Sequence, residues 1–413
     1  MGIVREVVED YLEVEVDGVE RELEVPLPRV PRAIAITGPR RAGKSFYMLQ
    51  RFKRLLSQIP ALYLPLDDDR LYPPTLDTLG ELLEVFHEIH DERRGVLFLD
   101  EVQEVQKWEL FVKRAVSLGH TVFVSGSSSK LLSREIATQL RGRGVSFELY
   151  PFSFREFLRA KSFEPGESLP KKARIKALLE EYLRWGGFPE VVLEKSELLK
   201  RKTLEGYVDL ILYRDVVERF GVKNTRALRL LLRLIGSSFG REFSINRTAR
   251  YMRGIGIEAN RNTLSAYLEH LEDAYLVVRV KKLAPPRESE KALPKVYLID
   301  TGLVRVFKEN LELGRLMESV VLTELLRMGI RPYYLKTQRF EVDFVIREGD
   351  SYRLIQVTRS PEGDTLEREI KALGEASKLI PVHERTLITW DDEGEIGRVK
   401  LVPLWRWLLG VKP

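Results

Sequence analysis

Short apolar runs alternate with amphipathic stretches between residues 33 and 150. Five runs read as buried strands: 33–37, 61–66, 95–99, 121–125 and 145–150. Stretches with apolar residues three and four positions apart, such as 45–56 and 79–90, separate them. Buried strands joined by helices are typical of a parallel sheet with crossover helices. The pattern predicts an α/β fold, whose ligands bind beyond the carboxyl ends of the strands.

A different pattern precedes this region. Residues 11–25 alternate apolar and charged positions on either side of Asp17-Gly18. Alternation with a period of two around an Asp-Gly pair predicts a β-hairpin, whose apolar face would carry Leu12, Val14 and Val16. We therefore interpret residues 1–26 as a hairpin appendage and residues 27–150 as the core.

Helical periodicity dominates residues 151–224 and is interrupted at Gly186-Gly187-Phe188-Pro189, which predicts a helical lid. Residues 225–283 contain further helical stretches and a strand at 274–280. Within them Leu264, Leu268 and Leu271 are spaced to form one buried helix face. Residues 284–413 return to mixed strands and helices, so the chain is predicted to have five parts.

Composition narrows the class of protein. A chain of 413 residues with 44% hydrophobic and 31% charged residues is expected to fold into several domains. The absence of cysteine excludes disulfides, thiol catalysis and thiolate zinc sites. No run of eighteen apolar residues occurs, and the first ten residues are unlike a signal peptide. We expect a cytoplasmic protein that does not enter a membrane.

The loop after the first predicted strand reads Gly38-Pro39-Arg40-Arg41-Ala42-Gly43-Lys44-Ser45 and leads into a helix at Phe46. A G-x-x-x-x-G-K-S pattern between a strand and a helix binds phosphates through backbone N–H groups and the positive helix end. Gly38 and Gly43 permit the backbone angles and close approach that this needs. We expect residues 38–46 to bind ATP, with Lys44 at the β/γ-phosphates and Ser45 at Mg²⁺.

Acidic and hydroxyl side chains follow two later strands. Asp100 ends one apolar run and is placed to hold Mg²⁺ opposite Ser45, while Glu101 is the candidate to polarise the attacking water. Ser125 and Ser127 follow the next strand and are candidates to orient that water, unless they form only a Ser/Gly turn. No N-K-x-D motif is present, which favours ATP over GTP.

Two arginines separated by glycine precede the last predicted strand, in Leu140-Arg141-Gly142-Arg143-Gly144. An arginine that reaches the γ-phosphate of a neighbouring subunit raises the hydrolysis rate about 10³–10⁵-fold. Arg141 and Arg143 are candidates for this role. The alternative is a pair of surface arginines on a turn.

Six segments together resemble a family of prokaryotic, especially archaeal, AAA+-type ATPases. They are G-P-R-R-A-G-K-S, L-F-L-D-E-V-Q, S-G-S-S-S, R-G-R followed by P-F-S-F-R-E-F, W-G-G-F-P-E-V and K-V-Y-L-I-D-T-G-L. The resemblance implies a P-loop domain with a helical lid, a winged helix and a C-terminal PD-(D/E)xK nuclease-like domain. It also implies an ATP-driven homo-oligomer, for which we expect a hexamer, and leaves the substrate open.

Residues 225–283 are similar to a winged helix and carry eleven Arg and Lys against five Asp and Glu. A basic recognition helix and wing would follow DNA phosphates. Five residues are the DNA-binding candidates: Arg261, Asn262, Ser265, Lys281 and Lys282. The alternative is a winged helix used only for protein contacts.

The last part looks like a restriction-type nuclease core, in which two acids hold Mg²⁺ and a lysine orients water. Asp343 fits the first acid and Glu318 the helix acid. Gln356 stands where the second acid belongs, and Thr358 where the lysine belongs. We expect a degenerate metal site and a domain that holds DNA or joins subunits.

Three functions compete on this sequence. The first is an ATP-driven motor or remodeller of DNA, including branched DNA in repair or recombination. The second is a nucleotide-switched regulatory or defence ATPase, and the third is an ATP-dependent nuclease.

Overall fold

The computed structural model describes residues 2–410 except 93, 127–141, 290 and 360–362. Two compact units make up the chain. The first comprises Met1–Tyr150 and Asp273–Tyr275, and the second comprises Pro151–Glu272 and Leu276–Pro413. No helix in the described ranges combines the length and apolarity needed to cross a bilayer.

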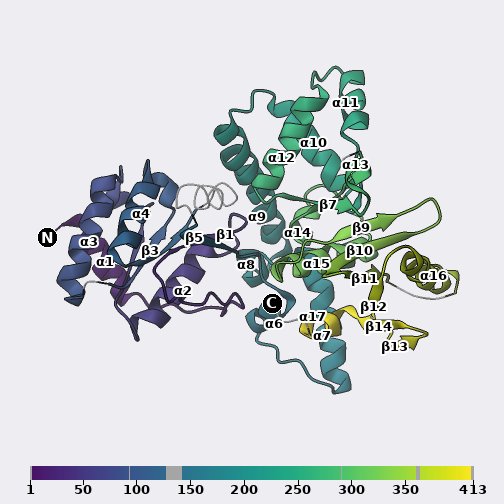
Figure 1. The fold of residues 1–413 in the computed structure, drawn as a ribbon, viewed down its shortest axis with the longest axis horizontal. Coiled ribbons are helices and arrows are strands. Elements are labelled where there is room, and N and C mark those ends of the chain that lie inside the picture. The colour runs from purple at the N-terminus through teal and green to yellow at the C-terminus, as the bar shows by residue number, and fades with distance from the viewer. Residues whose placement is uncertain (1, 93, 127–141, 290, 360–362, 411–413) are drawn as a thin grey trace. The chain divides into compact units, whose positions relative to one another are not determined.

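A parallel sheet forms the centre of the first unit (Figure 1). Its strand order is β2-β3-β4-β1-β5. Its strands are β1 (Ala33–Thr37), β2 (Ala61–Pro65), β3 (Val96–Asp100), β4 (Thr121–Ser125) and β5 (Gly144–Glu148). Every residue of the first four is buried, because helices cover both faces. The predicted α/β architecture is confirmed for this part, with strand limits shifted by no more than two residues.

Alternate residues of β1 face opposite layers of the core. Ala33 and Ala35 contact the layer formed by α1 (Ile3–Glu13), α3 (Leu76–His90) and α4 (Trp108–Leu118). Ile34 and Ile36 contact the layer formed by α2 (Lys44–Leu56). The period of two along a strand produces this three-layer arrangement.

The predicted N-terminal hairpin is wrong. Residues 3–13 form α1, and residues 14–32 contain no strand. Val4, Val7 and Val8 are spaced as one helix face and are fully buried against the sheet layer. Val14, on the face expected to dock, is 38% exposed. The helical spacing begins before residue 11 and continues to Tyr11 and Leu12, which pack partly buried against the core, so the helix takes up the start of the expected first strand.

A nine-stranded sheet runs through the second unit in the order β13-β14-β12-β11-β10-β9-β7-β8-β6. Its strands are β6 (Arg241–Glu242), β7 (Val277–Lys282), β8 (Lys295–Leu298), β9 (Tyr333–Lys336), β10 (Glu341–Glu348), β11 (Ser351–Val357), β12 (Val382–Thr389), β13 (Gly394–Ile396) and β14 (Val399–Pro403). The β7–β9, β11–β12 and β12–β14 pairs are parallel, and the other pairs are antiparallel. Packed on its C-terminal part is α16 (Asp364–Leu379), whose Leu373 and Ala376 are buried.

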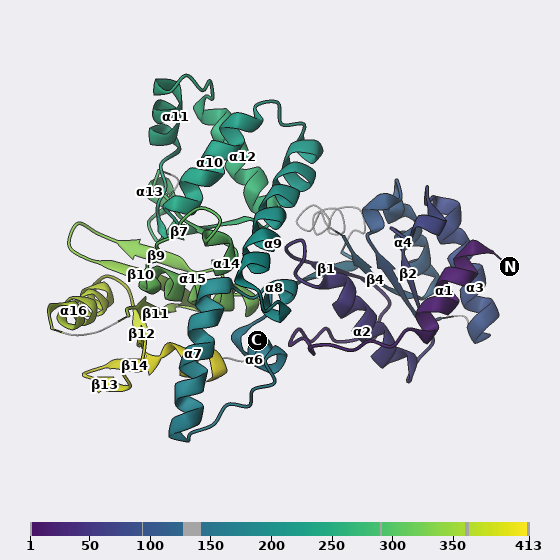
Figure 2. The same cartoon turned by 180° about the vertical axis from the view of Figure 1, so that it is seen from behind.

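Three helices gather at one end of this unit: α10 (Thr225–Ser237), α11 (Ile245–Gly254) and α12 (Arg261–Asp273) (Figure 2). They alternate with strands in the chain order α10-β6-α11-α12-β7-β8, and the short α13 (Pro286–Ser289) lies between the last two strands. β8 pairs with both β6 and β7. The predicted boundary at 283 therefore falls before the strand that completes this group.

Residues 151–224 are helical, as predicted. They form α6 (Phe154–Ala160), α7 (Leu169–Trp185), α8 (Pro189–Leu193), α9 (Glu197–Leu210) and the π-helix η3 (Ile211–Glu218). Their partners include α14 (Thr301–Val304), α15 (Leu313–Arg327) and α17 (Leu404–Gly410). Arg155 Nη2 lies 2.7 Å from Glu324 Oε1 in this layer. These helices belong to the second unit, and their role as a lid stays a prediction.

The glycine pair between α7 and α8 packs on a buried carboxylate. Asp300 accepts hydrogen bonds from the backbone N–H groups of Gly187 and Gly302, each at 2.8 Å. Gly186 has φ +75°, and a Cβ on it would lie 1.7 Å from Asp300 Oδ1. Two distant segments, 186–187 and 300–302, are therefore held together where a side chain cannot fit.

We predict that Gly186→Ala lowers the free energy of unfolding by about 1–3 kcal/mol, because alanine is strained at this φ and collides with Asp300. Urea unfolding of the whole chain measures the change. Gly374→Ala, in the open middle of α16 with no atom within 4 Å of the added Cβ, is the matched control and should be neutral or stabilising. Equal effects of the two substitutions would contradict the prediction.

Candidate functional site

The loop between β1 and α2 lies at the carboxyl end of the first unit's sheet. Gly43 precedes α2 with φ +92°, and Arg41 has φ +65°. The first turn of α2 contains no acidic residue, so the positive end of this helix is not offset by its own side chains. Backbone N–H groups at such a helix end are donors for an anion.

Gly38 lets two chain segments approach closely. A Cβ on Gly38 would lie 2.0 Å from the carbonyl oxygen of Leu149, just after β5. The Leu149 N–H in turn donates to the Thr37 carbonyl at 2.7 Å. Glycine is needed here for backbone packing as well as for its angle, φ +138°.

Lys44 turns its side chain back into the loop. Its ammonium donates to the carbonyl oxygens of Gly38 at 3.1 Å and Pro39 at 3.0 Å, and the residue is buried. Arg41 and Ser45 are exposed, while Arg40 and Phe46 are half-buried and Ala42 is buried. The predicted residues 38–46 thus form one continuous loop and helix start.

Asp100, at the end of β3, is the most enclosed acid of this site. Tyr63 donates to its Oδ2 at 2.8 Å, and Ser125 at the end of β4 donates to its Oδ1. Burial raises the pKa of Asp100 to about 6, against the lowering effect of hydrogen bonds from Ser45 and Tyr63. The Ser45 and Asp100 oxygens are donors of the kind that Mg²⁺ prefers, so these residues fit that ion.

Glu101 follows Asp100 in the left-handed region, with φ +51°. Its backbone N–H donates to Asp100 Oδ1 at 3.2 Å, and Gln103 Nε2 donates to its carboxylate. Burial and the charge of Glu101 raise the pKa of Asp67. Gln103 and Asp67 therefore belong to the surroundings of Glu101. Gln103 ends the L-F-L-D-E-V-Q segment, but the sequence interpretation assigned no role to either residue.

The structure brings Ser125 to Asp100 but does not bring Arg143 to the loop. The Arg143 carbonyl accepts from the Ala33 N–H at 3.0 Å, at the amino end of β1. A five-residue strand is roughly 16 Å long, so Arg143 lies at the opposite edge of the sheet from Lys44. Ser127 and Arg141 lie outside the described residues.

Arg21 holds the loop through hydrogen bonds to backbone carbonyl oxygens. Its buried guanidinium donates to the carbonyl oxygens of Ala42 at 2.7 Å and Tyr150 at 2.5 Å. It thereby links the loop to the chain after β5. The sequence interpretation missed Arg21, because a single arginine in a predicted hairpin carries no signal for such a contact.

The predicted DNA-binding residues lie on α12 and β7, and their side chains differ in solvent exposure. Arg261 and Asn262 are exposed at the start of α12, and Ser265 is half-buried on it. Lys281 is exposed and Lys282 half-buried in β7. On α11 three further arginines are exposed, which the sequence interpretation missed: Arg247, Arg250 and Arg253.

The predicted nuclease residues meet in a second site. Glu318, Asp343 and Gln356 line a cavity of about 1200 Å³ in the second unit, together with Glu341 and Lys295. Lys295 was not among the candidates, because the expected lysine position was that of Thr358. The Thr358 N–H donates to the Ile388 carbonyl at 2.9 Å, as part of the sheet.

The parallel sheet and the glycine-lysine loop define a P-loop protein. Residues 30–158 match the family described as an AAA domain, and residues 176–312 match a domain of unknown function. The chain is 34% identical to the uncharacterized protein MJ1544 of Methanocaldococcus jannaschii, over 98% of this chain and 95% of that protein. It belongs to the family that includes MJ1544.

A second relative, from a bacterium, also aligns over nearly the whole of both chains. An uncharacterized protein of Haemophilus influenzae is 30% identical, over 91% of this chain and 93% of its own length. Among solved structures, the Walker-type ATPase PABY2304 of Pyrococcus abyssi has a TM-score of 0.47 and 14% identity, covering 74% of this chain and 94% of that one. The Aeropyrum pernix ORC2 protein has a TM-score of 0.37 and 13% identity, covering 79% and 94%.

We predict that Arg21→Met lowers the free energy of unfolding by about 2–4 kcal/mol, because two carbonyls lose a charged donor. Arg29→Met, an exposed arginine of the same segment, should change it by less than about 0.5 kcal/mol. Urea unfolding of both variants provides the comparison. A loss at Arg21 no larger than that at Arg29 would contradict the bracing role.

Proposed function

We propose that this protein binds ATP with Mg²⁺ and hydrolyses it. The observation that carries the proposal is the convergence of Lys44, Ser45, Asp100 and Ser125 at one edge of a parallel sheet. Residues 38–46 would hold the phosphates, with backbone N–H groups and the Lys44 ammonium as donors. Ser45 and Asp100 would hold Mg²⁺, which offsets phosphate charge when bound.

Glu101 is the proposed base for the attacking water. Its backbone is fixed by the bond to Asp100, and Gln103 restrains its carboxylate. Ser125 serves as a positioning residue in this proposal, because it donates to Asp100 and thereby fixes the direction of that carboxylate. Arg143 lies at the opposite edge from Lys44, so it could act on ATP only from a neighbouring subunit. Such a role would require an oligomer, for which a hexamer remains our expectation.

We further propose that the ATPase acts on DNA through the α10–α12 group. Its order of helices and strands, and the pairing of β8 between β6 and β7, support the interpretation of this group as a winged helix. The exposed arginines of α11 and Arg261 of α12 give this group a basic surface. Asn260 is occupied as the cap of α12, since its Oδ1 accepts from the Thr263 N–H at 2.8 Å.

We predict that Lys44→Ala reduces ATP turnover at least about 10²-fold, because the developing charge on the phosphates loses a preorganised donor. Glu101→Gln should retain ATP binding while slowing hydrolysis by a similar factor, since it removes the base and keeps the loop. Steady-state turnover and binding of a fluorescent ATP analogue separate the two effects.

Lys113→Ala, at an exposed position of α4, is the control and should leave both measurements unchanged. Wild-type-like turnover in Lys44→Ala would refute the proposed ATPase site. A loss of ATP binding in Glu101→Gln would refute the assigned role of Glu101 alone.

We predict that replacing Arg247, Arg250, Arg253 and Arg261 by alanine weakens DNA binding and flattens its salt dependence. Each phosphate that no longer meets an arginine should reduce the slope of log K against log salt by about 0.9. Fluorescence anisotropy with single-stranded, duplex and four-way-junction DNA at several salt concentrations measures both quantities.

Lys171 and Arg174, two exposed cations of α7, are the matched control pair for alanine replacement. An equal loss of affinity in that pair would indicate unspecific charge attraction. No binding by the wild-type protein to any of the three DNAs would favour the nucleotide-switched regulator instead.

A further inference from the structure

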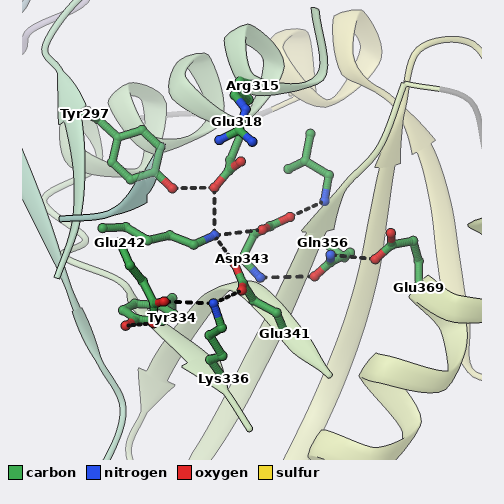
Figure 3. Close-up of polar contacts among 12 residues, drawn as sticks. Glu242, Tyr297, Arg315, Glu318, Tyr334, Lys336, Glu341, Asp343, Gln356 and Glu369 are labelled. Carbon is green, nitrogen blue, oxygen red and sulfur yellow. Dashed lines mark hydrogen bonds and ion pairs between the residues drawn. The ribbon is translucent and has the colours of Figure 1, made fainter. Parts of the chain in front are cut away.

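Lys295, the first residue of β8, places its ammonium among three carboxylates. Its Nζ lies 3.0 Å from Glu318 Oε1, 3.1 Å from Asp343 Oδ1 and 2.7 Å from Glu341 Oε1. The three acids come from α15 and β10 and point toward one another (Figure 3). Lys295 is 3% exposed, so this cation is enclosed by protein.

An ammonium has three N–H donors, and here each has a carboxylate within reach. The distances are those of charge-assisted N–H···O bonds, whereas Mg²⁺ lies 2.0–2.1 Å and Ca²⁺ 2.3–2.6 Å from its oxygen ligands. The same oxygens would need to move inward by up to about 1 Å to hold a divalent ion. Lys295 therefore occupies the point on which a metal would sit.

The surrounding groups hold this arrangement. Tyr297 donates to Glu318, and Lys336 lies 3.1 Å from the other oxygen of Glu341. The Val357 N–H donates to Asp343 Oδ2 at 3.1 Å. Donors outside the cluster thus hold the three carboxylates in place around the Lys295 ammonium, and no further group is needed to balance it.

Gln356 is also occupied. Its Oε1 accepts from the Asp343 N–H at 3.0 Å, and its Nε2 donates to Glu369 Oε2 at 2.6 Å. The amide oxygen, the atom that could ligate a metal, is directed at the backbone. Among the described residues, no group of three or more His, Cys, Asp or Glu side chains is arranged to hold a metal ion.

The electrostatic environment also favours a charged Lys295. Burial disfavours the charged form of Lys295, but the neighbouring Asp343 and Glu318 outweigh it and raise the pKa of Lys295. Burial and the charge of Asp343 raise the pKa of Glu318 to about 7. The neighbouring carboxylates therefore favour the charged form of Lys295.

We propose that the Lys295 ammonium is a built-in replacement for the divalent cation of a nuclease-like site, so that the cluster is closed to metal and does not cleave DNA. All three of its donors are used, which leaves none for a phosphate or a nucleophilic water. Described residues lining the cavity include eight acidic and five basic side chains, a balance that repels a phosphodiester chain.

One consequence distinguishes this proposal from a merely damaged site. Replacing Lys295 removes the cation from between three carboxylates, and carboxylate oxygens are the ligands that a hard divalent cation takes. The substitution Lys295→Ala should therefore create a metal site that the wild-type protein lacks.

The test is Mn²⁺ binding to nucleotide-free protein, measured by electron paramagnetic resonance and by the shift in melting temperature. Lys295→Ala should bind Mn²⁺ at least about tenfold more tightly than the wild type and gain thermal stability from it. Adding Asp343→Asn to Lys295→Ala should weaken that binding about 10- to 100-fold, which assigns the ion to this cluster and not to Ser45 and Asp100.

Lys295→Gln is the second variant, because it keeps most of the side-chain volume, removes the charge and offers an amide oxygen to the ion. Folding of either variant only in the presence of Mn²⁺ supports the proposal, since the metal then replaces the missing cation. Folded variants that bind no more Mn²⁺ than the wild type would overturn it. Mn²⁺ binding by the wild type that Asp343→Asn abolishes would also overturn it.

Discussion

A buried carboxylate that must stay aligned is the constraint on which the first unit depends. Asp100 is 2% exposed, and burial alone favours its neutral form. The hydroxyl groups of Tyr63, Ser125 and Ser45 oppose that tendency by donating to it. Because these donors come from β2, β4 and α2, the order of strands in the sheet determines whether the acid can act as a ligand.

Buried carboxylates in the second unit are stabilised by other kinds of donor. Asp300 is buried and accepts from two backbone N–H groups, so it joins the turn at Gly187 to α14 and has no cation in contact with it among the contacts described. Glu318, Glu341 and Asp343 are instead compensated by a lysine. Asp100, which accepts from hydroxyl groups, can still bind a metal ion. Asp300, which accepts from backbone N–H groups, has a structural role. The three carboxylates around Lys295 are neutralised by its ammonium and are not open to a metal ion.

These differences explain what the sequence could predict. The strands of the first sheet and the loop at 38–45 were predictable, because buried strands are continuous apolar runs and the loop has a fixed spacing. Ser125 was a candidate because it ends a neighbouring strand, but its hydrogen bond to Asp100 was not predicted. Arg21 was not predictable, since its partners at Ala42 and Tyr150 are backbone carbonyls brought near only by the fold. The hairpin was wrong because Asp17-Gly18 outweighed the helical spacing of Val4, Val7 and Val8.

Two lysines show why residue type alone did not decide the function of either site. The Lys44 ammonium donates to the neutral carbonyl oxygens of Gly38 and Pro39. A triphosphate offers charged oxygens, which form stronger charge-assisted bonds and can compete for that ammonium. Lys295 already makes such bonds with three carboxylates, and breaking them would leave buried charges unpaired. Exchange of partners is therefore favourable at Lys44 and unfavourable at Lys295, which is the physical basis for proposing a ligand at the first site and none at the second.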